Sequence, residues 1–144
     1  MIEIIKTVLE NTQNRTPMVH SITNNVTIND CANIILAAGG TAIMAQDERE
    51  VEEITSHAQA LVINMGAVRA QEAMLRAAKI AKRNGRPVVL DPVAAGASTL
   101  RREMCSHLLS ENLVSVIRGN ASEVRALAAG AEQDTGGDAS APDS

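Results

Sequence analysis

The sequence contains no phenylalanine, tyrosine or tryptophan among its 144 residues. It therefore lacks the flat aromatic side chains on which single-stranded nucleic acids stack. Positive charge is also in short supply, because 13 Lys and Arg residues face 17 Asp and Glu residues, giving a net charge of −4 at pH 7. Nucleic-acid-binding domains normally present a basic surface. The composition thus argues against a nucleic-acid partner.

Cysteine and long apolar runs are scarce as well. Two cysteines, Cys31 and Cys105, are too few for a disulfide framework or a cysteine-based zinc site, and they suit a reducing cytoplasm. No apolar run approaches the roughly 18 residues needed to cross a bilayer. The N-terminal residues Met-Ile-Glu-Ile-Ile-Lys lack the basic region and cleavage site of a secretory signal. These features predict a cytoplasmic protein with no membrane partner.

The common sequence fingerprints of nucleotide sites and hydrolases are missing. There is no G-x-x-x-x-G-K-[ST] loop, no G-x-G-x-x-G turn and no G-x-S-x-G elbow. The three histidines, His20, His57 and His107, are too scattered to predict a metal cluster. Any catalytic chemistry must come from other residues.

The residues that are present follow a regular alternation. Hydrophobic residues make up 45% of the chain, enough for one packed domain. Short β-rich runs are separated by stretches in which apolar residues recur at helical spacing. The runs occupy residues 18–23, 41–44, 60–64, 87–91 and 114–117. This alternation predicts an α/β fold, with a mostly parallel sheet and helices on both faces.

Cap and stop signals predict where several helices begin and end. Helices are expected over 27–38, from Asp47 (paired with Glu50 as a capping signal) towards His57, around 74–81, from Ser98 or Thr99 onwards, and over 121–129. The last helix is expected to end at Gly130. Beyond it lie four acids, no basic residue and no Val, Ile, Leu or Met. We therefore expect a domain over 1–130 and a flexible acidic tail over 131–144.

Polar residues directly follow the predicted strands, at the edge where ligands bind in open α/β sheets. Asp91 emerges from a buried strand and precedes small residues; it either binds a metal or orients phosphate, or it caps a local turn. Asn24 follows the first strand and either caps the next helix or contacts a small polar ligand. Met44 ends another strand and either packs in the core or contacts a ligand.

The segment 118–123 offers a second candidate for phosphate chemistry. The guanidinium of Arg118 could grip phosphate oxygens, and Glu123 could bind Mg²⁺ on the first turn of a helix capped by Asn120. The alternative is structural, because Asn120 and Glu123 have the spacing of a capping box. The residues alone leave both interpretations open.

Five motifs together resemble the hydroxyethylthiazole kinase family of the ribokinase-like superfamily. They occur in family order between about residues 17 and 130. Written by their residues, the motifs are His20-Ser21-Ile22-Thr23-Asn24-Asn25, Met44-Ala45, Leu61-Val62-Ile63-Asn64-Met65-Gly66, Leu90-Asp91-Pro92-Val93 and Ile117-Arg118-Gly119-Asn120-Ala121-Ser122-Glu123. The resemblance implies a three-layer ribokinase-like fold. It also implies that ATP and Mg²⁺ phosphorylate 4-methyl-5-(2-hydroxyethyl)thiazole in thiamine salvage.

The resemblance also implies residue roles. Met44, Asn24 and Gly66 would bind the thiazole alcohol, and the family is trimeric, with each active site built between subunits. The nucleotide side of the site would use four further residues. Arg118 and Asn120 would bind ATP, and Asp91 and Glu123 would hold the metal.

Two departures from the family pattern affect the expected activity. Ala94 stands where the family usually has glycine, which would strain the loop if the position needs a positive φ angle. The chain also ends near the middle of the family's length, so the Gly-Thr-Gly-Cys segment that supplies the catalytic base is expected in the missing half. We therefore expect a weak or inactive kinase. The alternatives are a non-catalytic thiazole-binding or trimer-forming subunit, and another ribokinase-like enzyme such as a hydroxymethylpyrimidine kinase, which Asn24-Asn25 and Met44-Ala45 argue against.

Overall fold

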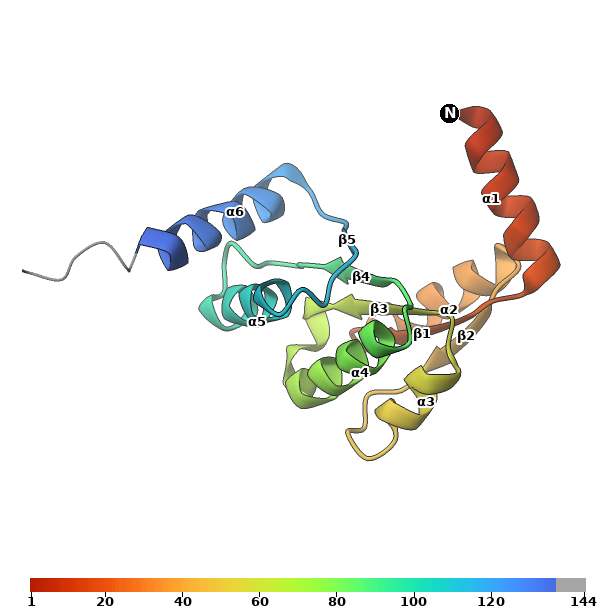
Figure 1. Cartoon of the computed structure of the whole chain (residues 1–144), viewed down its shortest axis with the longest axis horizontal. Coiled ribbons are helices and arrows are strands. Elements are labelled where there is room, and N and C mark those ends of the chain that lie inside the picture. Colours follow the sequence, from red (N-terminus) through yellow and green to blue (C-terminus); the bar gives the residue numbers. More distant parts are fainter. Residues whose placement is uncertain (137–144) are drawn as a thin grey trace, which may run out of the picture.

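The computed structural model describes the backbone of residues 1–136 and the side chains of residues 1–130. Five parallel strands form one sheet in the order β2-β1-β3-β4-β5. The strands are β1 (Met18–Ile22), β2 (Thr41–Met44), β3 (Ala60–Asn64), β4 (Val88–Asp91) and β5 (Val116–Ile117). The predicted α/β fold with a parallel sheet is confirmed (Figure 1).

Helices fill the connections between the strands. They are α1 (Ile2–Arg15), α2 (Ile28–Ala37), α3 (Val51–His57), the 3₁₀ helix η1 (Met65–Ala70), α4 (Gln71–Arg83), α5 (Thr99–Ser110) and α6 (Ala121–Gly136). Strand β2 lies on one side of β1, whereas β3 and the later strands lie on the other side. The direction in which strands are added to the sheet therefore reverses at β1. Because such crossovers are right-handed, α2 covers one face of the sheet and α3, α4 and α5 cover the opposite face. Among residues 1–136, no helix combines the length and apolar character needed to cross a membrane.

The core lies between the sheet and helices α4 and α5. Inward-facing Leu61, Ile63 and Leu90 are fully buried against α4. Helix α4 presents a face of small residues to them, with only one larger side chain: Ala73, Met74, Ala77, Ala78 and Ala81. Small side chains let the helix approach the strands closely, so the core packs without aromatic residues.

The first helix was missed by the sequence analysis. Helix α1 buries none of its residues and extends away from the sheet (Figure 1). Its apolar residues, among them Ile2, Ile4, Ile5 and Val8, are exposed rather than packed in the core. The helix therefore presents an exposed apolar surface.

Two helix boundaries differ from the prediction. Helix α3 begins at Val51, not at Asp47: residues 48–50 form a turn, in which the Asp47 carboxylate accepts the backbone N–H of Arg49 and the Asp47 carbonyl accepts the N–H groups of Glu50 and Val51. Helix α6 continues past Gly130 to Gly136. The rest of the predicted acidic tail, residues 137–144, lies outside the described residues.

Ala94 adopts a left-handed conformation with a φ of 57°. A side chain is strained there, whereas glycine is not. We expect Ala94→Gly to raise the free energy of unfolding by about 0.5–1 kcal/mol, because the relieved strain exceeds glycine's added chain entropy. Urea denaturation measures this change. Ala97→Gly, at an exposed position of the same loop without a positive φ, should instead destabilise the protein; equal effects of the two changes would contradict the prediction.

Candidate functional site

The site lies where the order of strand addition reverses, between the carboxyl ends of β1 and β3. Such a switch point leaves a crevice, because the connections from the two strands run to opposite faces of the sheet. Asn24 follows β1 and Asn64 ends β3, so the two amide side chains meet at this crevice. Residues that are 40 positions apart in sequence are thereby brought within hydrogen-bonding distance.

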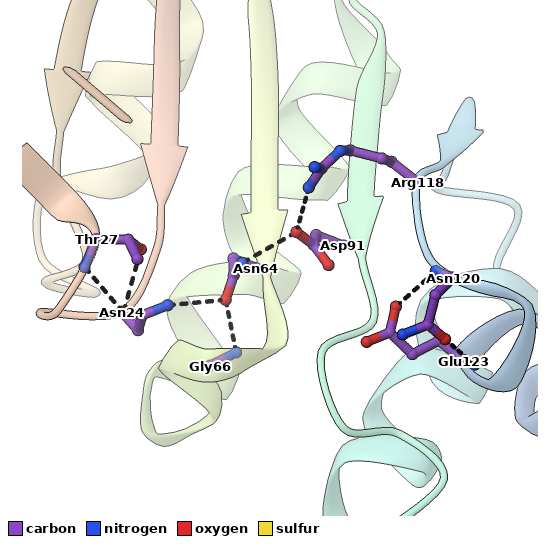
Figure 2. Close-up of polar contacts among 8 residues, drawn as sticks. All are labelled: Asn24, Thr27, Asn64, Gly66, Asp91, Arg118, Asn120 and Glu123. Atoms are coloured by element: carbon purple, nitrogen blue, oxygen red, sulfur yellow. Dashed lines mark hydrogen bonds and ion pairs between the residues drawn. The ribbon is translucent and has the colours of Figure 1, made fainter. Parts of the chain in front are cut away.

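Four side chains form a continuous line along this edge, which we call the edge network: Asn24, Asn64, Asp91 and Arg118. Asn24 Nδ2 donates to Asn64 Oδ1 at 3.4 Å, and Asn64 Nδ2 donates to Asp91 Oδ2 at 3.2 Å. Arg118 completes the line with a 3.1 Å contact from its guanidinium to the same carboxylate oxygen. Figure 2 shows the network crossing from β1 to the segment after β5. The predicted residues Asn24, Asp91 and Arg118 therefore belong to one connected group.

Asn24 also shapes the turn that follows β1. Its Oδ1 accepts the backbone N–H groups of Val26 and Thr27 and the Thr27 hydroxyl, at 3.0–3.1 Å. Asn24 therefore orders the turn that leads into α2, whereas the N-cap of that helix is Thr27 and not the predicted asparagine. The two roles use different atoms, since the oxygen orders the turn and the Nδ2 group reaches Asn64.

Asp91 is the central acid of the network. Its side chain is 17% exposed, and burial raises the pKa of the carboxyl above its usual value. The nearby Arg118 guanidinium opposes this rise, while the charge of Glu123 adds to it. A partly buried carboxylate with one cation beside it is suited to receive a second cation, which would relieve the repulsion from Glu123.

Asn120 and Glu123 form the capping box that the sequence analysis left as an alternative. Asn120 Oδ1 accepts the Glu123 N–H and Glu123 Oε2 accepts the Asn120 N–H, both at 2.9 Å. The box also fixes these side chains beside Asp91, because Asp91, Arg118, Asn120 and Glu123 line one cleft of about 450 Å³, the β4–β5 cleft.

The donor set of the β4–β5 cleft suits Mg²⁺. The ion prefers oxygen ligands and is commonly held by one or two carboxylates together with substrate phosphates. Asp91 and Glu123 supply two carboxylates to the same cleft. The described residues contain no group of three or more His, Cys, Asp or Glu side chains able to hold a metal ion by themselves. The residues therefore fit a metal that phosphate oxygens help to bind.

The three predicted substrate residues do not line one cavity. Asn24 and Gly66 lie in a cleft of about 410 Å³ at the switch point, the β1–β3 cleft. Met44 lies in a neighbouring cleft of about 250 Å³, the β1–β2 cleft, which shares Thr23 and Gln46 with the first. The two clefts are adjacent, so a common ligand would have to extend past Thr23.

Comparison with known proteins decides the family. The model for the hydroxyethylthiazole kinase family matches residues 9–143. A hydroxyethylthiazole kinase of Clostridium acetobutylicum is 51% identical over 129 residues, which are 88% of this chain and 47% of that protein. The chain belongs to the hydroxyethylthiazole kinase family. A second relative of the same name, from Desulfovibrio desulfuricans, is 53% identical over 84% of this chain and 43% of its own length.

Solved structures agree with this assignment. A hydroxyethylthiazole kinase protein from Pyrococcus horikoshii superposes with a TM-score of 0.84 at 39% identity, covering 92% of this chain and 54% of that one. An adenosine kinase from Schistosoma mansoni, at 15% identity and a TM-score of 0.50, shares the fold alone. The chain spans about half the length of the curated hydroxyethylthiazole kinases it matches.

The sequence analysis did not name His20 as a site residue, although it lies in the first motif of the hydroxyethylthiazole kinase resemblance. The imidazole is fully buried. Nε2 lies 2.8 Å from the Ala45 carbonyl and Nδ1 lies 2.9 Å from the Thr55 hydroxyl. Because a carbonyl can only accept, Nε2 carries the proton and Nδ1 accepts the hydroxyl. The neutral ring thus ties β1 to the Met44–Ala45 turn and to α3.

Acidification should destabilise the protein through His20. Burial lowers the pKa of this histidine below its usual value of about 6.5. Below pH 6.5 the unfolded chain therefore takes up a proton that the folded chain refuses, so stability falls until the folded pKa is reached. Urea midpoints between pH 7.5 and 5, roughly the range around an ordinary histidine pKa, measure the slope.

The matched variants are His20→Gln and His57→Gln. We expect the urea midpoint of His20→Gln to depend less on pH, because the buried ring no longer contributes. His57→Gln, changed at the exposed end of α3, should keep the pH dependence that comes from His20. An unchanged slope in His20→Gln would assign the acid sensitivity to other groups.

Proposed function

We propose that this chain forms the substrate side and part of the phosphate side of a kinase that phosphorylates 4-methyl-5-(2-hydroxyethyl)thiazole with ATP. The observation that supports the proposal most is the edge network, which links Asn24 on the substrate side to Asp91 and Arg118 on the phosphate side. Membership in the hydroxyethylthiazole kinase family supplies the reaction. Phosphoryl transfer depends mainly on positioning and charge stabilisation, and a rigid network of this kind serves both.

The β4–β5 cleft would receive the phosphates of ATP. Arg118 has an exposed side chain, so its remaining N–H groups can contact phosphate oxygens while one nitrogen stays on Asp91. Asn120 lines the same cleft from the position just before α6. Asp91 and Glu123 would hold Mg²⁺, which, when bound, neutralises charge that develops on the transferring phosphoryl group.

The β1–β3 cleft would receive the thiazole alcohol. Asn24 offers a hydrogen-bonding amide, and Gly66 lines the same cleft, where its lack of a side chain leaves room for Asn24 and Asn64 to pack against its backbone. Met44 would contact the ligand from the adjoining β1–β2 cleft. The proposed arrangement, with Met44 in one cleft and Asn24 and Gly66 in the next, suits a ligand that has a ring at one end and a hydroxyl directed towards Asp91.

A mass-spectrometric assay for the phosphorylated thiazole alcohol tests the proposal. The purified chain is incubated with ATP, Mg²⁺ and the alcohol, and binding of the alcohol is measured in parallel by calorimetry. We expect specific binding of the alcohol and turnover below about 1 s⁻¹, the low end for kinases. A folded chain that neither binds nor phosphorylates the alcohol would refute the proposal.

A second candidate, a non-catalytic subunit, is favoured by one observation. The apolar side chains of α1, including Ile2, Ile4 and Val8, are exposed and suit association with another polypeptide. We infer a homotrimer, by analogy with the family, and a cytoplasmic setting, since Cys31 and Cys105 are free thiols. Binding of the alcohol without any binding of ATP would favour this candidate over the kinase.

A further inference from the structure

The backbone at the end of strand β2 forms a wall of two clefts. Met44, Ala45 and Gln46 line the β1–β2 cleft, and Gln46 also lines the β1–β3 cleft. The position of this short segment therefore helps to set the shape of both clefts. We call residues 44–46 the β2 exit segment.

Regular pairing within the sheet ends inside this segment. The register between β1 and β2 finishes with Ser21 opposite Met44. Among the described strands, β2 lies at one end of the sheet and has β1 alone as a neighbour. Residues 45–47 then belong to no helix, strand or turn. Segments without regular pairing are more mobile than the elements they connect, so other contacts must hold this one in a single conformation.

The buried His20 ring supplies such a contact from beneath the segment. His20 lies on β1 opposite Ile43, and its Nε2–H donates to the Ala45 carbonyl at 2.8 Å. On the other side of the ring, Nδ1 accepts the hydroxyl of Thr55, which is itself 1% exposed, at 2.9 Å. The ring is thus anchored on α3 while it holds the β2 exit segment.

His20 acts on the clefts without lining them. Its side chain is fully buried, and it is not among the residues that line the β1–β3 or the β1–β2 cleft. A ligand in these clefts therefore meets Met44, Ala45 or Gln46 rather than the imidazole. Any influence of His20 on binding passes through the Ala45 carbonyl.

Stability of the fold does not account for a histidine at this position. Burial lowers the pKa of the ring, as expected for a polar group that has been removed from water. Replacing both partners of a buried hydrogen bond by apolar groups of the same shape can be nearly neutral for stability. What the hydrogen-bonded ring adds is direction, because it fixes one carbonyl in one place.

We propose that His20 is a positioning residue for substrate binding, which holds the β2 exit segment through the Ala45 carbonyl in the conformation that accepts the thiazole alcohol. The inference rests on the proposed function for the identity of the ligand. Binding groups that are held in place from behind raise affinity, because the ligand does not have to order them.

Two substitutions separate the two hydrogen bonds of the ring. The side chain of His20→Gln is long enough to place an amide N–H near the position of Nε2, so a donor for the Ala45 carbonyl remains. The shorter side chain of His20→Asn places only its oxygen near the position of Nδ1, where it accepts the Thr55 hydroxyl. In calorimetric titrations, we expect His20→Asn to bind the thiazole alcohol about tenfold more weakly than wild type, and His20→Gln to recover most of that loss.

Leu108→Ala is the control for a general loss of stability. Leu108 is fully buried on α5 and lines neither cleft, so its truncation lowers the unfolding temperature without moving the β2 exit segment. We expect its affinity for the alcohol to equal that of wild type. The affinity of His20→Asn for ATP with Mg²⁺ should also be unchanged. Equal losses of alcohol affinity in all three variants, or no loss in His20→Asn, would overturn the proposal.

Nuclear magnetic resonance of the wild type decides the question if His20→Asn does not fold. Saturation with the alcohol should shift the signal of the His20 Nε2–H together with the amide signals of the β2 exit segment. Shifts confined to Asn24 and Gly66 would overturn the proposal, because the ligand would then bind without engaging the segment that His20 holds.

Hydrogen exchange without any ligand keeps the two proposals distinguishable. Amides of residues 44–47 should exchange faster in His20→Asn than in His20→Gln, while those of β3 serve as the internal reference. If they do, and the alcohol binds to none of the proteins, only the proposed kinase function fails. If the alcohol binds equally to wild type and His20→Asn, only the positioning role fails.

Discussion

Asp91→Asn should weaken magnesium-dependent binding of ATP about a hundredfold while leaving the fold at least as stable. The carboxylate is the one acid that contacts both Asn64 and Arg118 and also lines the β4–β5 cleft with Glu123. Asparagine keeps the size of the side chain but removes the charge that a metal ion requires. Calorimetry with ATP, in the presence and absence of Mg²⁺, measures the effect.

The stability half of this prediction follows from the pKa of Asp91. Burial raises that pKa, so the folded protein favours the neutral form, and stability falls as the pH rises through the carboxyl's range. At pH 7 the asparagine variant avoids the free-energy cost of holding an ionised carboxylate in this partly buried position. The lost contact to Arg118 matters little, because the arginine side chain is 79% exposed.

Asp30→Asn is the control for Asp91→Asn. Asp30 is an exposed acid on the first turn of α2, away from the β4–β5 cleft. Its neutralisation should change neither the affinity for ATP with Mg²⁺ nor the unfolding temperature appreciably. Equal ATP affinities of wild type and Asp91→Asn would remove Asp91 from the nucleotide site.

Gly66→Ala should disrupt the substrate side of the edge network. A Cβ at this position would lie 2.7 Å from Asn64 Oδ1 and 2.9 Å from Asn24 Nδ2, closer than nonbonded atoms approach. The two asparagines must then separate, which breaks their 3.4 Å contact and the 2.8 Å bond from the Gly66 N–H to Asn64 Oδ1. We expect a loss of about 1–3 kcal/mol in the free energy of unfolding, the range for overpacking.

Binding of the thiazole alcohol should fall together with stability in Gly66→Ala, and calorimetry can follow both quantities. Gly96→Ala is the matched control, because its added methyl group would lie 3.5 Å from Ala126 Cβ, an ordinary contact. We expect a change within about 0.5 kcal/mol there. If both glycine variants behave alike, the close approach at Gly66 has no functional meaning.

The sequence predicted short apolar strands well, whether or not the structure buries them. The strands at 41–44 and 60–64 have the predicted bounds, although only the second has buried residues, Leu61 and Ile63. Helix α1 was not predicted, although Ile2, Ile5 and Leu9 recur at helical spacing; the structure leaves its apolar side chains exposed. Helix α3 starts at Val51, later than predicted, because the turn at 48–50, which Asp47 stabilises through its carbonyl and carboxylate, precedes it.

The site was predictable one strand at a time but not as an assembly. Asn24, Asp91 and Arg118 each stood out because they follow a strand. Asn64 joins them, yet its role depends on the strand order, which places β3 between β1 and β4. The sequence of residues 60–66 does not by itself indicate which strands lie on either side of β3. The family resemblance implied a common pocket for Met44, Asn24 and Gly66; in the structure Met44 lines the adjoining β1–β2 cleft, and that shared role stays a prediction.

The order of the strands also has a consequence for folding during synthesis. After β1 and β2 have paired, β3 joins the free edge of β1, β4 then joins β3, and β5 joins β4. The sheet can thus extend in the same direction as translation, without reopening a pairing already made. At every stage the unpaired edge to which the next strand adds belongs to a recently synthesised strand. Within the described residues, the last strand on that side of the sheet is β5.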